Sequence, residues 1–180
     1  MVYILLGTGF EEMEAIAPLD LLRRAGISVL TVGLQDKTVI GGHGIPLQAD
    51  ITLEEMDLTT LDMIVLPGGL GGVASVRACP QALHTLRFAH ENNKFVCAIC
   101  AGPTVLADLG ITDGKQATCY PGCESGMGNA NIIPNAACVR DGNIITGTSA
   151  GCAVSFGLML IEALKDAQVA ETVRRQIVIR

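Results

Sequence analysis

Apolar residues follow two alternating patterns along this chain. Short continuous runs indicate strands that are buried on both faces of a sheet, and apolar residues at every third or fourth position indicate amphipathic helices. The predicted strands are Val2–Leu6, Ile27–Gly33, Leu61–Leu66 and Lys94–Ile99, and the predicted helices are Glu11–Ala25, Pro80–Asn92, Pro103–Leu109, Cys152–Lys165 and Val169–Arg174. This alternation predicts an α/β fold with a mainly parallel sheet and helices on both of its faces.

Turn-forming residues mark the remaining segments. We expect hairpins over Thr38–Gln48 and Ala136–Gly147, a glycine-rich loop over Pro67–Gly72 and a terminal extended piece over Gln176–Ile179. No internal repeat or linker interrupts the pattern. The sequence therefore predicts a single domain over residues 1–180.

The composition limits the class of protein to which the chain can belong. Hydrophobic residues make up 49% of it and charged residues only 17%, which excludes a disordered chain. The net charge is −6 and no basic cluster exceeds a pair of arginines, so neither a nucleic-acid footprint nor a basic membrane-surface helix is expected. No membrane span and no signal peptide are predicted either, because no apolar stretch is long enough and the first residues lack a basic region.

The cysteines point to a reducing environment. Their number, seven, is odd and their spacing is irregular, which predicts free thiols and a cytoplasmic location. Because the chain has only three histidines and no convincing ligand spacing, we expect no metal site and no cofactor.

Cys100 stands at the joint between a predicted strand and a predicted helix. The sequence AICAG at residues 98–102 resembles the nucleophile elbow G-x-S-x-G, in which small residues allow a tight strand-to-helix turn. The positive end of the helix that starts at Pro103 favours a thiolate, so we expect a pKa well below that of a free thiol. The alternative is that Cys100 fills space in the core, which is the role expected for Cys97.

The glycine-rich loop Pro67–Gly72 reaches the same edge of the sheet. Its glycines permit close backbone approach, so the N–H of Gly69 can act with that of Ala101 as an oxyanion hole. The alternative is a flexible turn without a chemical role.

Glu14 is the candidate acid. It lies four residues before Pro18, whose missing N–H leaves the Glu14 carbonyl without its helical partner. A local distortion there would turn Glu14 toward the thiol, where it would be protonated and donate a hydrogen bond to sulfur. The alternative is a surface position, which we expect for Glu11 and Glu12 at the start of the same helix.

Three segments together carry a resemblance to a known family. They are GFEEMEAIAPLDLLRRAGI, DMIVLPGG and AICAGPTVLADLGI. In order and spacing, from Val2 to about Ala167, the chain resembles the ThiJ/PfpI superfamily, in the branch of the Parkinson-disease protein deglycase. The resemblance implies a flavodoxin-like sandwich and a homodimer. It also implies that Cys100 is an oxidisable nucleophile, with Glu14 as its protonated partner and Gly69 and Ala101 as backbone donors around the sulfur.

The chain departs from this branch at several positions. Where many members have a histidine in a Thr-His-Pro context, the chain has Tyr120, between Cys119 and Pro121. Cys152 replaces a proline of the late Thr-Ser-x-Gly-Pro-Gly-Thr segment, and His43 lies where the branch often has an arginine that reaches a partner subunit's site. The candidates for the pocket are therefore Gly68, Tyr120, His43 and Cys152. Three cysteines can act as resolving thiols or as packing residues, namely Cys119, Cys123 and Cys152, and two histidines are expected at the surface, namely His84 and His90.

These observations lead to one functional hypothesis and two alternatives. The resemblance implies a cofactor-free thiol enzyme that acts on methylglyoxal-type α-oxoaldehydes or glycated protein adducts and protects against oxidative stress. In that chemistry Cys100 attacks the aldehyde and Glu14 transfers protons. The first alternative is a non-enzymatic redox sensor or chaperone whose output is Cys100 oxidation. A cysteine peptidase or amidase is disfavoured, because no histidine is in place to protonate the leaving amine.

Overall fold

A seven-stranded sheet forms the centre of the computed structural model, which describes residues 1–179. Its strand order is β10-β11-β7-β6-β1-β2-β5, and only β10 and β11 pair antiparallel. In chain order the strands are β1 (Val2–Leu6), β2 (Val29–Gly33), β5 (Ile51–Thr52), β6 (Met63–Leu66), β7 (Phe95–Ile99), β10 (Cys138–Asp141) and β11 (Ile144–Gly147). The mainly parallel α/β architecture predicted from the sequence is confirmed.

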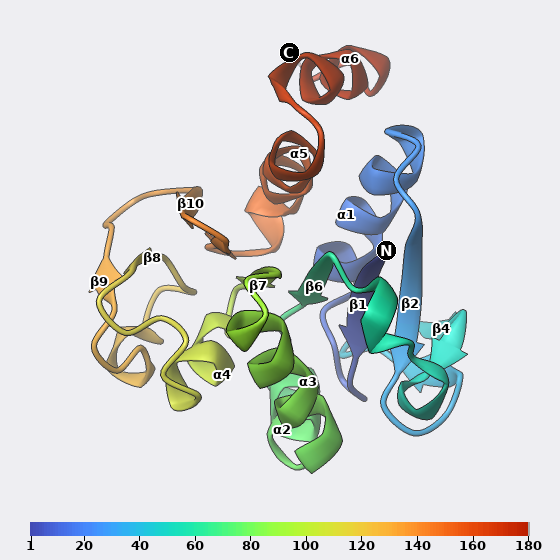
Figure 1. Ribbon diagram of the computed structural model, residues 1–180, viewed down its shortest axis with the longest axis vertical. Helices are drawn as coiled ribbons and strands as arrows, with labels where there is room; N and C mark the ends of the chain where they lie inside the picture. The colour runs from blue at the N-terminus through green and yellow to red at the C-terminus, as the bar shows by residue number, and fades with distance from the viewer. Residues whose placement is uncertain (180) are drawn as a thin grey trace.

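Helices cover both faces of the sheet, as Figure 1 shows. One face carries α1 (Glu12–Arg24), α5 (Ala153–Leu164) and α6 (Ala167–Gln176), and the other carries α2 (Leu70–Arg77), α3 (Pro80–Glu91) and α4 (Pro103–Asp108). Within β1, Ile4 and Leu6 join the core on the α1 side, whereas Tyr3 and Leu5 join the core on the α2 side. Because alternate residues are buried on opposite faces, the strand is a continuous apolar run.

Smaller elements complete the chain. The predicted hairpin over Thr38–Gln48 consists of β3 (Thr38–Ile40) and β4 (Pro46–Gln48), and a second small pair consists of β8 (Gln116–Ala117) and β9 (Asn131–Ile132). Four 3₁₀ helices lie in the connections, namely η1 (Leu53–Glu55), η2 (Leu58–Thr60), η3 (Glu124–Gly126) and η4 (Ala150–Cys152). No helix within residues 1–179 is long and apolar enough to cross a membrane.

Two predictions about local structure are wrong. The loop predicted over Pro67–Gly72 is shorter, because Leu70 already begins α2. The expected extended piece Gln176–Ile179 is not a strand, since α6 continues to Gln176 and Val178 has a φ of 56°.

The strand order has one reversal point, which bears on where a ligand can bind. The connections from β1 lead toward β2 on one side, whereas β6 and β7 lie on the other side of β1. The order therefore reverses between β1 and β6, and in open α/β sheets ligands bind beyond the carboxyl ends of the strands at such a point. The segments that follow β1, β6 and β7 contain Glu14, Gly69 and Cys100, respectively.

Candidate active site

Cys100 occupies a strained turn directly after β7. Its φ is 65°, a left-handed value that costs a non-glycine residue about 1–2 kcal/mol. The turn is held by hydrogen bonds on both sides, from the N–H of Cys100 to the carbonyl of Gly147 at 2.9 Å and from the N–H of Gly102 to that of Ile99 at 2.9 Å. The backbone thus confirms the elbow predicted from the sequence.

Gly102 is the glycine that this turn requires. A Cβ at this position would lie 2.8 Å from the carbonyl oxygen of Leu66 and 2.9 Å from that of Ile99. Both contacts are to backbone atoms, which cannot move aside cheaply. The first glycine of the elbow pattern is not needed here, because Ala98 fits at that position with its side chain fully buried.

Glu14 is turned inward from the first turn of α1. The residue is 0% exposed, and its Oε2 accepts a hydrogen bond from the N–H of Gly68 at 2.8 Å. The N–H of Glu11 donates to the carbonyl of Gly68 at 3.0 Å, so the helix start and the loop after β6 hold each other. Oε1 of Glu14 is buried and makes no hydrogen bond of good geometry within the described chain. The inward position predicted for Glu14 is confirmed.

Burial raises the pKa of Glu14 to about 7, while hydrogen bonding with the Cys100 side chain and with the N–H of Gly68 acts in the lowering direction. A carboxyl with this pKa exchanges its proton near neutral pH. It is therefore suited to act as either acid or base.

The thiol of Cys100 does not follow the expectation of a low pKa. Burial raises its pKa to about 12, with further increases from the charge of Glu14 and from hydrogen bonding to it, against the lowering effect of the N–H groups of Ala101 and Gly69. The low pKa predicted from the start of the helix is wrong. Helix α4 has only six residues, and the effect of burial on the thiol outweighs that of the helix. Each of the two groups affects the pKa of the other, so Glu14 and Cys100 titrate as a coupled pair.

Gly69 and Ala101 are the two backbone donors to the sulfur, and they lie in different loops. Gly69 has a φ of 83°, and a Cβ on it would be 2.4 Å from the carbonyl oxygen of Gly9. Only glycine fits there. In this structure both N–H groups lower the pKa of the Cys100 thiol. That they also donate hydrogen bonds to a substrate oxygen stays a prediction.

Tyr120 stands where many members of the resembled family have a histidine, and it contacts Cys100 through its backbone. Its N–H donates to the carbonyl oxygen of Cys100 at 2.8 Å, and its side chain is largely exposed. Cys119, beside it, is buried, and the half-buried Cys152 lines a cavity of about 460 Å³ together with Cys119 and Thr148. Cys97 is 0% exposed, as expected for a packing residue.

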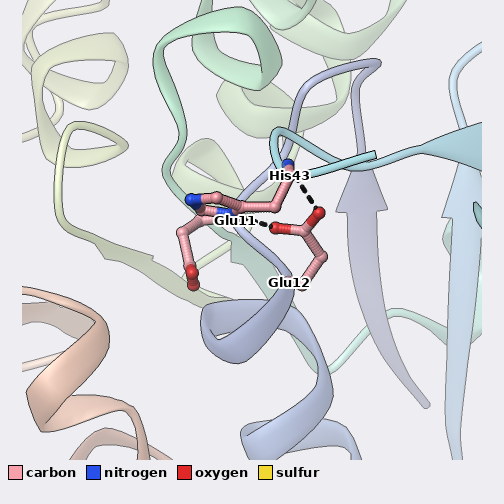
Figure 2. A group of neighbouring side chains, drawn as sticks. All are labelled: Glu11, Glu12 and His43. Atoms are coloured by element: carbon pink, nitrogen blue, oxygen red, sulfur yellow. Dashed lines mark hydrogen bonds and ion pairs between the residues drawn. The ribbon is translucent and has the colours of Figure 1, made fainter. Parts of the chain in front are cut away.

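His43 contacts Glu12 rather than the thiol (Figure 2). The backbone N–H of His43 donates to Oε1 of Glu12 at 2.8 Å, and its Nδ1 lies 2.8 Å from Oε2. The surface position predicted for Glu12 is therefore wrong, since this residue is 7% exposed and ties the β3–β4 hairpin to α1. His43 lines a hollow of about 450 Å³ that it shares with Gly69, next to the Cys100 site.

The Glu12–His43 contact affects the pKa of both residues. Burial raises the pKa of Glu12, but hydrogen bonds from the side chain and backbone of His43 outweigh it, so the net direction is downward. The same carboxylate raises the pKa of His43, whose side chain is mostly exposed.

One group of side chains has atoms that can bind a metal ion. Glu11, Glu12 and His43 offer ligand atoms that all lie within 4.8 Å of one another (Figure 2). Both oxygens of Glu12 already contact His43, so hydrogen bonds account for this arrangement.

Of the other histidines, His84 is exposed as expected, whereas His90 is half-buried with an enclosed Nδ1.

The chain is similar to several known proteins in sequence and in fold. The sequence profile described as the DJ-1/PfpI family matches residues 1–163. The protein named dj-1beta of Drosophila melanogaster is 34% identical over 98% of this chain and 95% of its own length, and its crystal structure covers 99% of this chain with a TM-score of 0.94. A protein of Pyrococcus abyssi named a deglycase is 31% identical over 91% of this chain and 99% of its own length. The structure titled oxidized DJ-1 of Toxoplasma gondii is 27% identical, with a TM-score of 0.93 over 98% of this chain and 97% of that one.

Proposed function

The chain belongs to the DJ-1/PfpI family, and we propose that it is a cysteine-dependent, cofactor-free enzyme that converts methylglyoxal-type α-oxoaldehydes or removes their adducts from proteins. Relatives named deglycase support an activity of this class. The observation that carries the proposal is the placement of the buried Glu14 carboxyl beside the half-buried Cys100 thiol, since a Cβ on Gly68 would lie 2.6 Å from Oε2 of Glu14 and 3.1 Å from the sulfur. Burial also raises the pKa of this carboxyl to about 7.

The chemistry needs only this pair and its backbone donors. The Glu14 carboxylate takes the thiol proton of Cys100 as sulfur attacks the aldehyde carbon, and the resulting carboxylic acid then protonates the oxygen to give a hemithioacetal. The proton on the former aldehyde carbon then moves to the neighbouring carbonyl carbon, and the hydroxyl proton moves to the neighbouring carbonyl oxygen, through an enediol. The product is a thioester, which water hydrolyses to the hydroxy acid and free thiol. One carbon is oxidised and its neighbour is reduced, so no redox cofactor takes part.

The test is methylglyoxal turnover by the wild type and by Cys100→Ser. We expect lactate formation by the wild type and its loss in Cys100→Ser, because an alcohol is far harder to deprotonate at this site. Cys79→Ser is the matched control, since Cys79 is a half-buried thiol at the start of α3. Wild-type turnover in Cys100→Ser, or none in the wild type, would refute this function.

A second candidate is a redox sensor in which Cys100 is oxidised to the sulfinate. It is favoured by the N–H groups of Gly69 and Ala101, which can donate to sulfinate oxygens, and by the relative whose structure is titled oxidized. Selective gain of two oxygen atoms at Cys100 under peroxide, without aldehyde turnover, would support this candidate over the enzyme. A peptidase is disfavoured, because His43 is paired with Glu12 and the other two histidines, His84 and His90, lie on α3.

We further propose a homodimer in the cytoplasm. Large apolar side chains lie exposed around the start of α1, on the β3–β4 hairpin and at the start of α2, namely Met13, Ile16, Ile40, Ile45 and Leu70. Contiguous exposed apolar residues of this kind favour association. The seven free cysteines of the described chain suit a reducing compartment.

A further inference from the structure

The two N–H donors that face the sulfur of Cys100 belong to segments that one side chain joins. Gly69 directly precedes α2, and Arg77 is the last residue of that helix. The guanidinium of Arg77 donates from Nε to Oδ2 of Asp108 at 2.7 Å and from Nη2 to Oγ1 of Thr104 at 2.8 Å, both on α4. Arg77 therefore joins α2, which begins directly after Gly69, to α4, which begins shortly after Ala101.

Thr104 transmits this restraint to Ala101. Its hydroxyl donates to the carbonyl oxygen of Ala101 at 2.7 Å, and its N–H donates to the same oxygen at 3.1 Å. Thr104 is 6% exposed, so water does not compete freely for these bonds. Because Arg77 occupies a lone pair on the hydroxyl oxygen, the hydroxyl hydrogen remains directed at Ala101.

The peptide on the other side of Ala101 is restrained as well. The N–H of Ala101 belongs to the planar peptide whose carbonyl is that of Cys100. That carbonyl accepts a hydrogen bond from the N–H of Tyr120 at 2.8 Å. Ala101 thus lies between two fixed peptide planes, one held by Tyr120 and the other by Thr104 with Arg77.

We propose that Arg77 and Thr104 are positioning residues of the Cys100 site, which fix the direction of the Ala101 N–H and its separation from the Gly69 N–H. The side-chain hydrogen bonds of Arg77 and Thr104 within the described chain go to other groups than the sulfur. A purely stabilising role is a poor account of the arrangement, because the ion pair between Arg77 and Asp108 is about half exposed and such pairs contribute little. The inference rests on the proposed function only in taking Cys100 as the reacting thiol, and it requires no particular substrate.

The test is the rate at which iodoacetamide alkylates Cys100 as a function of pH, followed by mass spectrometry of the intact protein and its peptides. Thr104→Val removes the hydroxyl at nearly constant shape, and Arg77→Met removes the guanidinium at similar length. Since a misdirected N–H stabilises the thiolate less, we expect each change to slow alkylation at neutral pH roughly threefold to tenfold. In the proposed reaction, kcat should fall by a similar factor with KM little changed.

Two further variants separate positioning from general structure. Thr104→Ser keeps the hydroxyl and should restore the wild-type profile, and Arg87→Met changes an exposed arginine on α3 and should have no effect. Arg77 is partly exposed, so its variant tests the inference even where Thr104→Val folds poorly. Wild-type alkylation profiles in folded Thr104→Val and Arg77→Met would overturn the inference, as would equal slowing in Arg87→Met or slowing that persists in Thr104→Ser. Alkylation needs no turnover, so a failure of the aldehyde reaction is distinguishable from a failure of this inference.

Discussion

The buried carboxyl of Glu14 lies beside the half-buried thiol of Cys100, and the charge on the carboxyl raises the pKa of the thiol. Each partner is held from outside the pair. The N–H of Gly68 holds Oε2 of Glu14 at 2.8 Å, and the N–H groups of Gly69 and Ala101 act on the sulfur. A substitution at either member of the pair is therefore expected to change the protonation of both.

Glu14 should make the folded protein less stable as the pH rises through the weakly acidic range. The folded state holds its proton up to about pH 7, whereas the unfolded chain releases it near the ordinary value of 4.5. Between these values the folded state binds more protons, so the free energy of unfolding falls with rising pH. The full difference corresponds to at most about 3 kcal/mol, lost by the time the pH passes about 7.

Urea denaturation of the wild type and of Glu14→Gln at a series of pH values measures this effect. Glutamine does not titrate, so the difference in unfolding free energy between the two proteins should change across this interval. His43 has a raised pKa and its effect has the same sign, but it is present in both proteins and cancels in the difference. A difference that stays constant with pH would contradict the raised pKa of Glu14.

Gly68→Ala should disrupt the pair while leaving most of the fold intact. A Cβ at Gly68 would lie 2.6 Å from Oε2 of Glu14, 2.7 Å from Cβ of Cys100 and 3.1 Å from its sulfur. We expect loss of turnover and a destabilisation of about 1–3 kcal/mol, because overpacking forces these side chains apart. Gly151→Ala is the control, since its Cβ would meet only Oγ of Ser149, at 3.8 Å. Normal turnover in Gly68→Ala would show that the pair tolerates being separated.

The strands and the elbow were predictable because their signals are local. A continuous apolar run identifies a parallel strand, and small residues around Cys100 identify a tight turn. Helix α2 was missed because its first turn contains Gly71 and Gly72, which disfavour a helix in isolation. Contacts distant in sequence explain these glycines: a Cβ on Gly72 would lie 2.7 Å from Cα of Phe10.

The pKa values of Glu14 and Cys100 depend on burial, which could not be predicted from the sequence. The start of a helix after Cys100 indicated an acidic thiol, but desolvation is the larger effect and has the opposite sign. The Glu12–His43 contact was missed for a related reason. The two residues are 31 positions apart, and only the folding of the hairpin over α1 brings them together.

The homodimer should depend on the exposed apolar side chains of α1. Met13 is 58% exposed and Ile16 is 40% exposed, so replacing both with glutamate leaves the buried core of the subunit unchanged. Static light scattering at micromolar concentration should give a dimer for the wild type and a monomer for Met13→Glu/Ile16→Glu. The matched control is Val178→Glu, an exposed apolar residue near the end of the described chain. A wild-type monomer, or a dimer that survives the double substitution, would remove this surface from consideration.

Glu14→Gln should separate chemistry from folding in the proposed reaction. Glutamine keeps the size of the side chain and retains a donor for the sulfur, so the fold should persist, with equal or greater stability at neutral pH once the titrating carboxyl is gone. The thiol then has no adjacent base for the attack, and the oxygen of the adduct has no adjacent acid. Loss of general acid–base transfer typically lowers the rate about a hundredfold or more, and we expect that loss in kcat for methylglyoxal.

Glu11, which lies at the start of the same helix, is the control for the Glu14→Gln experiment. Glu11→Gln removes a charge from the start of the same helix and weakens its cap, because the Glu11 side chain accepts the N–H of Glu14 at 2.8 Å. That change should cost about 1 kcal/mol of stability yet leave turnover close to the wild type, since Glu11 does not contact the sulfur. Equal losses in both variants would assign the effect to the charge at the helix start. Unaltered turnover in Glu14→Gln would instead remove Glu14 from the reaction and leave Cys100 without an acid or base.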